Sequence, residues 1–209
     1  MTLVKSNLTS IKCCIVGSCG VGKTSIIKKH LDKNNINTET TLGAIFWTIE
    51  HHLNNGNSFK IDFWDTAGQE RYNSLIPMYS RNSNIIIIAF DIADKDSFDD
   101  LEKWLNTVSP YCKNSKFLLV GNKSDMELFR QVFEGDVQKF MNTYKNYKME
   151  YFETSARTGH QINELFEHIF FLSEAIITKN RIQGSIRKIN ELEYDEEMKN
   201  DNQSCCLIL

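Results

Sequence analysis

The segment 17–24, with the sequence GSCGVGKT, constrains the fold of this chain more than any other feature. It fits the pattern G-x-x-x-x-G-K-[ST], in which backbone N–H groups turn toward a phosphate and a helix N-terminus adds positive charge. An apolar, strand-like run at 11–16 precedes it, and a helix-like run at 25–31 follows. This order predicts a nucleotide-phosphate site, where Lys23 reaches the β- and γ-phosphate oxygens and the Thr24 hydroxyl can ligate Mg²⁺. The alternative is a chance match in a glycine-containing turn.

A second motif, Asn-Lys-Ser-Asp at 122–125, follows a strand-like run at 116–121. Guanine presents N1–H and an exocyclic amine as donors, so the Asp125 carboxylate can accept both, whereas adenine leaves it unpaired. We expect Asn122 to brace the phosphate loop and the Lys123 stem to lie along the purine plane. Alone, this tetrapeptide is typical of a surface turn, but behind a phosphate loop it predicts guanine recognition.

A third strand-like run at 149–152 leads into Ser155 and Ala156. Small residues there let a backbone N–H approach guanine O6 closely. Open α/β sheets bind ligands at the carboxyl ends of their strands, so this loop and the 122–125 motif are expected side by side.

Between the phosphate and base motifs lies WDTAGQE at 64–70, after a strand-like run at 58–63. Asp65 is placed to hold Mg²⁺ through its water shell, Gly68 to offer its N–H to the γ-phosphate, and Gln69 to orient an attacking water. A helix N-cap would explain Asp65 as well, but it would leave Gly68 and Gln69 without a role.

Period-two alternation assigns faces to the two strands around the turn at 54–57. It places Ile45, Trp47, Ile49 and Leu53 on one face and predicts that Phe46 and Trp64 lie on the wetter face. Exposed aromatic residues are usual interaction anchors. Packing of Trp64 under an adjoining helix is an equal alternative for that residue.

The composition indicates a single globular domain with a tail. The chain has 209 residues, of which 41% are hydrophobic, and strand-like runs alternate with helical patterns at 96–108, 135–144 and 161–177. These patterns predict an α/β fold with a mostly parallel sheet and helices on both faces, including a strand at 84–91 that is buried on both sides. The net charge of −3 disfavours nucleic-acid binding.

The cysteines and the C-terminal end indicate a reduced compartment and a lipid anchor. Residues 1–10 have no signal-peptide hydrophobic run, so we expect a cytosolic chain with free thiols. The sequence ends in CCLIL, and Cys206 with the last three residues fits C-a-a-X, a geranylgeranyl-type signal. The polar stretch 181–204 before it is expected to be disordered. Three interpretations of the terminal cysteines stay open: prenylation of both Cys205 and Cys206, acylation of one of them, or an accidental cysteine pair.

The order of these motifs resembles the small GTPases of the Ras superfamily over residues 11–177. Within that superfamily, WDTAGQERY at 64–72 and the terminal cysteine pair are similar to the Rab family, and 41–46 and 74–79 resemble its early-endosomal branch. The resemblance implies the P-loop small GTPase fold, α/β with a six-stranded, mostly parallel sheet. The domains would be an N-terminal extension (1–10), a GTP-binding domain (11–178) and a flexible tail (179–209).

The resemblance also implies roles for individual residues. Gln69 and Lys23 would be catalytic, and Thr24, Thr41 and Asp65 would serve the metal. Phe46, Trp64 and Tyr79 would form the aromatic triad that effectors contact, and Cys205 and Cys206 would be lipidated. The residues implied to bind GTP, GDP and Mg²⁺ are Ser18, Gly20, Val21, Gly22, Lys23, Thr24, Ser25, Thr41, Asp65, Gly68, Asn122, Lys123, Asp125, Ser155, Ala156 and Arg157.

The function implied is a GTP-hydrolysing switch in vesicle traffic, slow by itself because no arginine is evident in cis. Expected partners are an exchange factor, a GTPase-activating protein, effectors and a chaperone of the GDP form, for a monomer that binds no nucleic acid. Its place would be the cytoplasmic face of an intracellular membrane, endosomal by the branch resemblance, with a cytosolic GDP-bound pool. The alternatives are a constitutively loaded docking module and an ATP-using P-loop enzyme.

Overall fold

The computed structural model describes residues 9–31, 44–53, 58–66 and 74–204, and the side chains among them as far as residue 183. The described strands form a six-stranded sheet in the order β2-β3-β1-β4-β5-β6. All neighbouring strands are parallel except the antiparallel pair β2 and β3. The bounds are Ser10–Val16 for β1, Ala44–His52 for β2, Ser58–Thr66 for β3, Ile85–Asp91 for β4, Lys116–Asn122 for β5 and Glu150–Glu153 for β6.

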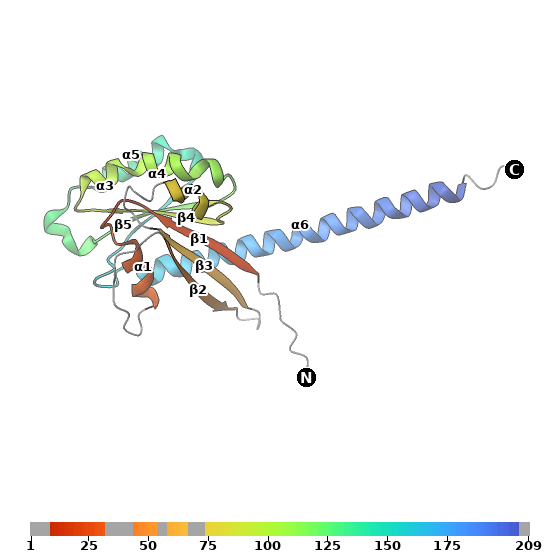
Figure 1. Cartoon of the computed structure of the whole chain (residues 1–209), viewed down its shortest axis with the longest axis horizontal. Helices are drawn as coiled ribbons and strands as arrows, with labels where there is room; N and C mark the ends of the chain where they lie inside the picture. Colours follow the sequence, from red (N-terminus) through yellow and green to blue (C-terminus); the bar gives the residue numbers. More distant parts are fainter. Residues whose placement is uncertain (1–8, 32–43, 54–57, 67–73, 205–209) are drawn as a thin grey trace. The chain divides into compact units, whose positions relative to one another are not determined.

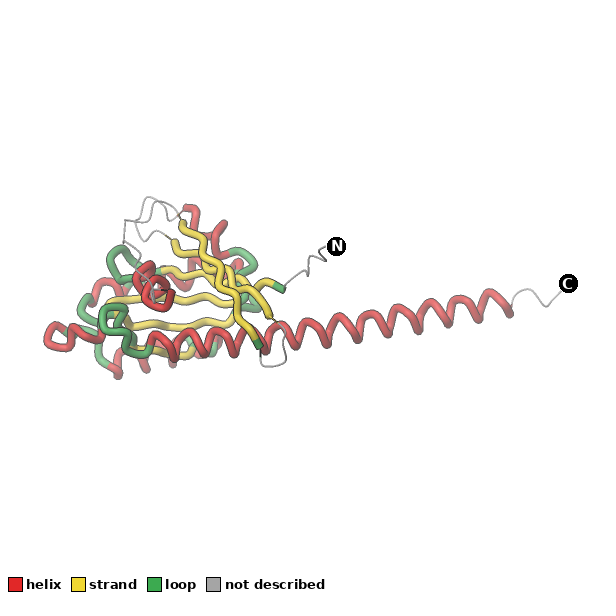
Figure 2. The backbone as a smooth tube through the Cα atoms, turned by 90° about the horizontal axis from the view of Figure 1, so that it is seen from below, coloured by secondary structure: helices red, strands yellow, loops and turns green. Residues whose placement is uncertain are grey.

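Helices cover both faces of this sheet (Figures 1 and 2). One face carries α2, α3, α4 and α5, and the other carries α1 and the beginning of α6. The bounds are Lys23–Leu31 for α1, Ile76–Ser80 for α2, Lys95–Asp99 for α3, Leu101–Val108 for α4, Glu134–Thr143 for α5 and Ile162–Ser204 for α6. Short 3₁₀ helices in the described part of the chain include η2 (Ser109–Tyr111), η3 (Ser124–Phe129) and η4 (Lys145–Tyr147). The predicted α/β fold class is confirmed.

The burial of the strands agrees with their sequence patterns. Every residue of β4 is buried, as predicted for a central strand covered on both sides. In β2, half-buried and exposed residues alternate from Ile45 onward, and Phe46 is 52% exposed. Trp64 on β3 is half-buried and packs against the hydrophobic core under α4. Both readings of Trp64 therefore hold in part, because the residue is partly exposed while its ring packs against the core and stacks on Tyr79 of α2.

Two helical predictions differ from the structure. The helix predicted at 96–108 is interrupted at Asp100, which separates α3 from α4. The stretch 181–204, predicted to be disordered, lies within α6, which continues to Ser204. This stretch has no proline, and it contains several Glu, Lys and Arg residues, whose intrinsic helix propensity opposes the disorder that its polarity suggests.

The chain divides into two compact units, residues 1–172 and 173–209. Searched over the described residues, none of the helices is both long and apolar enough to cross a bilayer. The cysteines at 13, 14, 19 and 112 are free thiols, as expected for a reduced chain.

Parallel pairing determines where the loops lie. Because β1, β3, β4, β5 and β6 run in the same direction, their carboxyl ends meet at one edge of the sheet. The phosphate loop after β1, Asp65 near the end of β3, and the loops after β5 and β6 are thereby brought to that edge. The candidate site lies there, as is usual for open α/β sheets.

Candidate functional site

The phosphate loop joins β1 directly to α1, and its glycines have backbone angles that other residues rarely adopt. Gly17, Gly20 and Gly22 have φ values of +145°, +79° and +97°. A Cβ at Gly22 would collide with the side-chain amide of Asn122. Gly22, which has no Cβ, therefore permits the close approach of the base-recognition loop to the phosphate loop.

Lys23 begins α1 and its side chain turns back over the phosphate loop. Its Nζ donates to the carbonyl oxygens of Gly17 and Ser18, both at 2.8 Å. The side chain is 5% exposed, and burial lowers the pKa of Lys23 to about 8, against a smaller opposing effect of Asp65. An ammonium group held in this way is preorganised for a phosphate oxygen, and an incoming phosphate compensates its desolvation.

Nucleotide affinity is expected to fall above pH 8. In the free protein Lys23 loses its proton near pH 8, whereas a bound diphosphate keeps it charged, so binding at higher pH takes up one proton. Affinity for GDP should fall up to about tenfold per pH unit above that value. The same depressed pKa makes the free fold more stable as pH rises from about 8 to 10.5, because the unfolded chain then binds more protons.

The measurement is titration calorimetry of GDP binding between pH 7 and 9.5, in buffers that differ in ionisation enthalpy. Proton uptake approaching one at pH 9.5 and near zero at pH 7 is the expected result. Equal affinity at both ends of the range, with no uptake, would contradict the depressed pKa of Lys23.

Thr24 and Asp65 form the part of the site that suits a metal ion. The Thr24 hydroxyl donates to Asp65 Oδ2 at 2.6 Å, and Asp65 is fully buried within β3. This position excludes the alternative of a helix N-cap. A hydroxyl and a single carboxylate beside a phosphate loop are the oxygen ligands with which proteins hold Mg²⁺ next to a nucleotide.

Asn122 joins the base side of the site to the phosphate side. Its Nδ2 donates to the carbonyl oxygen of Val21 at 2.8 Å, so the predicted brace is confirmed. Its Oδ1 accepts from the backbone N–H of Ala156 at 3.1 Å and from the Thr154 hydroxyl at 3.3 Å. One buried amide thus connects the loops after β1, β5 and β6.

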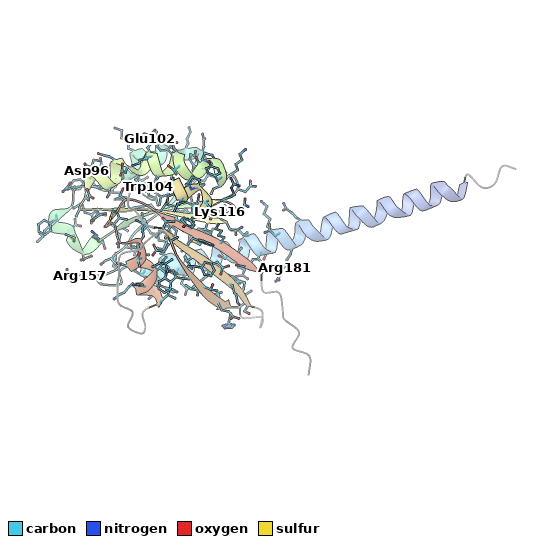
Figure 3. The ribbon with its side chains drawn as sticks, in the orientation of Figure 1. Asp96, Glu102, Trp104, Lys116, Arg157 and Arg181 are labelled. Atoms are coloured by element: carbon cyan, nitrogen blue, oxygen red, sulfur yellow. The ribbon has the colours of Figure 1, made fainter. Side chains whose placement is uncertain are left out.

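Asp125 is held as an ionised acceptor at the rim of this site. The Ser155 hydroxyl donates to Oδ1 at 2.6 Å, and the Arg157 guanidinium lies 3.6 Å from Oδ2. Chiefly because of the Ser155 hydrogen bond, and also because of Arg157, the pKa of Asp125 is below its ordinary value. The carboxylate is therefore charged at neutral pH and can accept from two donors on a base. Arg157, at the outer edge of this site, is labelled in Figure 3.

Asn122, Asp125 and Arg157 border an open pocket of about 470 Å³. Its volume lies in the range typical of small-ligand sites. The pocket is lined by Gly20, Gly22, Ser25, Lys28, Lys29, Asn122, Lys123, Asp125, Met126, Ala156 and Arg157. Lys28, Lys29 and Met126 are additions to the predicted set. The two lysines follow Ser25 on α1 at the i+3 and i+4 positions, which share its helix face, so their position could have been inferred from that spacing.

Three ion pairs that support the base loop were not predicted. Lys123, whose backbone is left-handed at φ +66°, has its Nζ 2.5 Å from Asp91 Oδ2 at the end of β4. Arg130 pairs through Nη2 with Glu153 Oε1 at 2.5 Å and with Glu127 Oε2 at 2.7 Å. Asp91 ends β4 at the edge of the sheet where the site lies, so its place in the sequence could have indicated a role in the site. Nothing in the sequence marks the partners of Arg130.

The residue sequence also matches the Ras family, over residues 12–174. The chain belongs to the Ras family. It is 32% identical over 203 residues to a probable Rab-related GTPase of Acanthamoeba polyphaga mimivirus, a match that covers 94% of this chain and 93% of the relative. It is 35% identical to Ras-related protein Rab-12 of Homo sapiens over 82% of this chain and 72% of the relative. It is 36% identical to putative ras-related protein Rab-5B of Dictyostelium discoideum, over 76% of this chain and 72% of that protein.

Family membership identifies the chain as a Rab-type small GTPase that binds guanine nucleotide and hydrolyses GTP. The pocket joined to the phosphate loop by Asn122 is the structural counterpart of that activity. Among the predicted site residues, Thr41, Gly68, Gln69, Cys205 and Cys206 lie outside the described residues, and their roles stay predictions.

The three side chains of the predicted aromatic triad are in contact with one another in a row, from Phe46 through Trp64 to Tyr79. The rings of Phe46 and Trp64 meet edge to face at 5.3 Å between centroids, and Trp64 stacks with Tyr79 at 5.8 Å. Lys12 Nζ lies 4.8 Å from the centroid of Trp64. Contacts across β2, β3 and α2 therefore build one aromatic surface, of which Phe46 is the most exposed member.

Proposed function

We propose that this GTPase is a regulated switch of membrane traffic, with a GTP form that binds effectors and a GDP form that releases them. The observation that supports this most is the hydrogen bond from Asn122 to Val21, which joins base recognition to the phosphate loop. The residues of this aromatic surface, Phe46, Trp64 and Tyr79, lie on elements that border in sequence the segments 32–43 and 67–73, where a γ-phosphate-sensing Thr41 and Gly68 are predicted. A partner seated there would contact the surface whose surroundings change on hydrolysis.

In the proposed reaction Lys23 donates to the β- and γ-phosphate oxygens while the loop amides surround them. Thr24, Thr41 and Asp65 would hold Mg²⁺, which supplies charge neutralisation between those phosphates. Gln69 orients the attacking water, and Asp125 selects guanine. An activating protein would supply further stabilisation of the transition-state charge.

The proposed regulators are an exchange factor, an activating protein and a chaperone of the GDP form. Prenylation of Cys205 and Cys206 is the proposed attachment to a membrane, because one lipid chain alone binds only marginally. The endosomal address rests on the resemblance at 41–46 and 74–79 and stays a prediction.

Gln69→Leu is expected to slow single-turnover phosphate release, by about tenfold without an activator and by more with one. The measurement loads wild type and variant with GTP and follows phosphate after Mg²⁺ is added. GTP affinity serves as the control, since Gln69 is assigned to the water and not to binding. Equal rates in the two proteins would favour the alternative, a docking module that keeps its nucleotide as structure.

A further inference from the structure

Ser18, the second residue of the phosphate loop, is hydrogen-bonded to the helices on the opposite side of the loop from α1. Its hydroxyl donates to Asp100 Oδ2 at 2.8 Å and accepts from Trp104 Nε1 at 3.1 Å. Its backbone carbonyl accepts from Lys23 Nζ at 2.8 Å. A single loop residue therefore contacts both the phosphate-binding ammonium group and α4, where Trp104 is labelled in Figure 3.

The chemistry of the three side chains fixes the direction of these bonds. An indole N–H can only donate and a carboxylate can only accept, so the Ser18 hydroxyl must accept from Trp104 and donate to Asp100. Trp104 is 3% exposed, and its N–H has no other partner among the described residues. Rotation of the Ser18 side chain about χ1 would carry its oxygen away from Trp104 and leave that buried donor unpaired, so the arrangement resists change.

Asp100 lies at the start of α4, where its carboxylate can accept the hydrogen bond from Ser18. It is the single residue between α3 and α4, and its own backbone N–H is satisfied by Asp96. Its side chain is 43% exposed, and a lysine on the next turn, Lys103, approaches it only to 4.0 Å. The hydrogen bond from Ser18 is the closest polar contact of this carboxylate among the described residues.

We propose that Trp104 and Asp100 are positioning residues for the nucleotide, acting through Ser18 to hold the phosphate loop in the conformation that receives the β-phosphate. Neither residue belongs to the phosphate-loop motif or lines the base pocket. A loop that is already ordered loses less conformational freedom when the ligand binds, so these bonds raise affinity without touching the ligand. The inference rests on the guanine-nucleotide function described above.

The test compares the affinities of GDP and GMP by titration calorimetry in Ser18→Ala and Trp104→Phe. Each variant should lose about five- to tenfold in GDP affinity, the size expected for one or two net hydrogen bonds, with a smaller loss for GMP. The ratio of GDP to GMP affinity should therefore fall. Asp100→Asn keeps an acceptor for the Ser18 hydroxyl and should retain most of that ratio, whereas Asp100→Ala should lose it.

Thr107→Ala is the matched control, because it also removes a hydroxyl, one that donates to the Lys103 carbonyl within α4. It should leave the ratio unchanged. If Ser18→Ala and Trp104→Phe leave the ratio at the wild-type value too, the positioning role is wrong. If wild type binds neither GDP nor GTP, the failure lies instead with the proposed function.

A spectroscopic signature separates positioning from a general loss of stability. The chain has three tryptophans, so its ¹⁵N spectrum should contain three indole N–H signals, of which Trp104→Phe removes one. That signal should shift in Ser18→Ala and again when GDP is removed from wild type. A signal insensitive to both changes would overturn the proposal, whatever the effect on unfolding temperature.

Discussion

Asp125→Asn is expected to lower GDP affinity by about 10²–10⁴-fold, because two hydrogen bonds to a charged acceptor are worth about 1.5–3 kcal/mol each. The variant should gain affinity for xanthine nucleotides. Xanthine has a carbonyl where guanine has its amine, so an asparagine can donate to that carbonyl while accepting from N1–H. Competition between mant-GDP and unlabelled GDP or XDP measures both changes.

The surroundings of Asp125 make this a test of base recognition rather than of folding. Asparagine keeps an oxygen that can accept from the Ser155 hydroxyl, which donates at 2.6 Å in the structure. Ser155→Ala is the matched comparison, because it removes that support and leaves the carboxylate. It should weaken GDP binding by less than Asp125→Asn and should not create affinity for XDP. An unchanged preference in Asp125→Asn would remove Asp125 from base recognition.

The parts of this site that the sequence predicted are those encoded by neighbouring residues. The phosphate loop, the strand before it and the helix after it share one short segment, so their order alone fixes their geometry. The alternation in β2 gave the exposure of Phe46, because a strand with one covered face has a period of two. The base motif followed because it begins at Asn122, the last residue of β5, and continues into η3 at the edge where the phosphate loop lies.

The contacts that were missed join residues far apart in the chain. Arg130 with Glu153 and Trp104 with Ser18 depend on which helix packs beside which loop, and no local pattern encodes that choice. The break at Asp100 belongs to the same class, since its flanking sequence favours an uninterrupted helix. In α6 the error was of the opposite kind, since a helix was missed and not added. The polarity of residues 181–204 suggested disorder, although several of these residues favour helix.

Gly17→Ala is expected to destabilise the fold by about 3–5 kcal/mol, from overpacking together with a strained backbone. Gly17 has φ +145°, and a Cβ there would overlap the backbone carbonyl oxygen of Ala89 on β4. That carbonyl lies in the central strand, whose residues are all buried, so it has no room to move. For a chain of this length the unfolding temperature should fall by about 10 °C.

Gly20→Ala separates the collision from the backbone strain. Gly20 also has positive φ, at +79°, but a Cβ there would meet no atom of the described residues within 4 Å. Its substitution should therefore cost only about 1 kcal/mol, the strain of a left-handed residue without the overlap. Urea unfolding of both variants, without nucleotide and with saturating GDP, measures the difference. Equal losses in the two variants would mean that the loop at Gly17 can move away from β4, and that contact with the central strand does not fix the start of the phosphate loop.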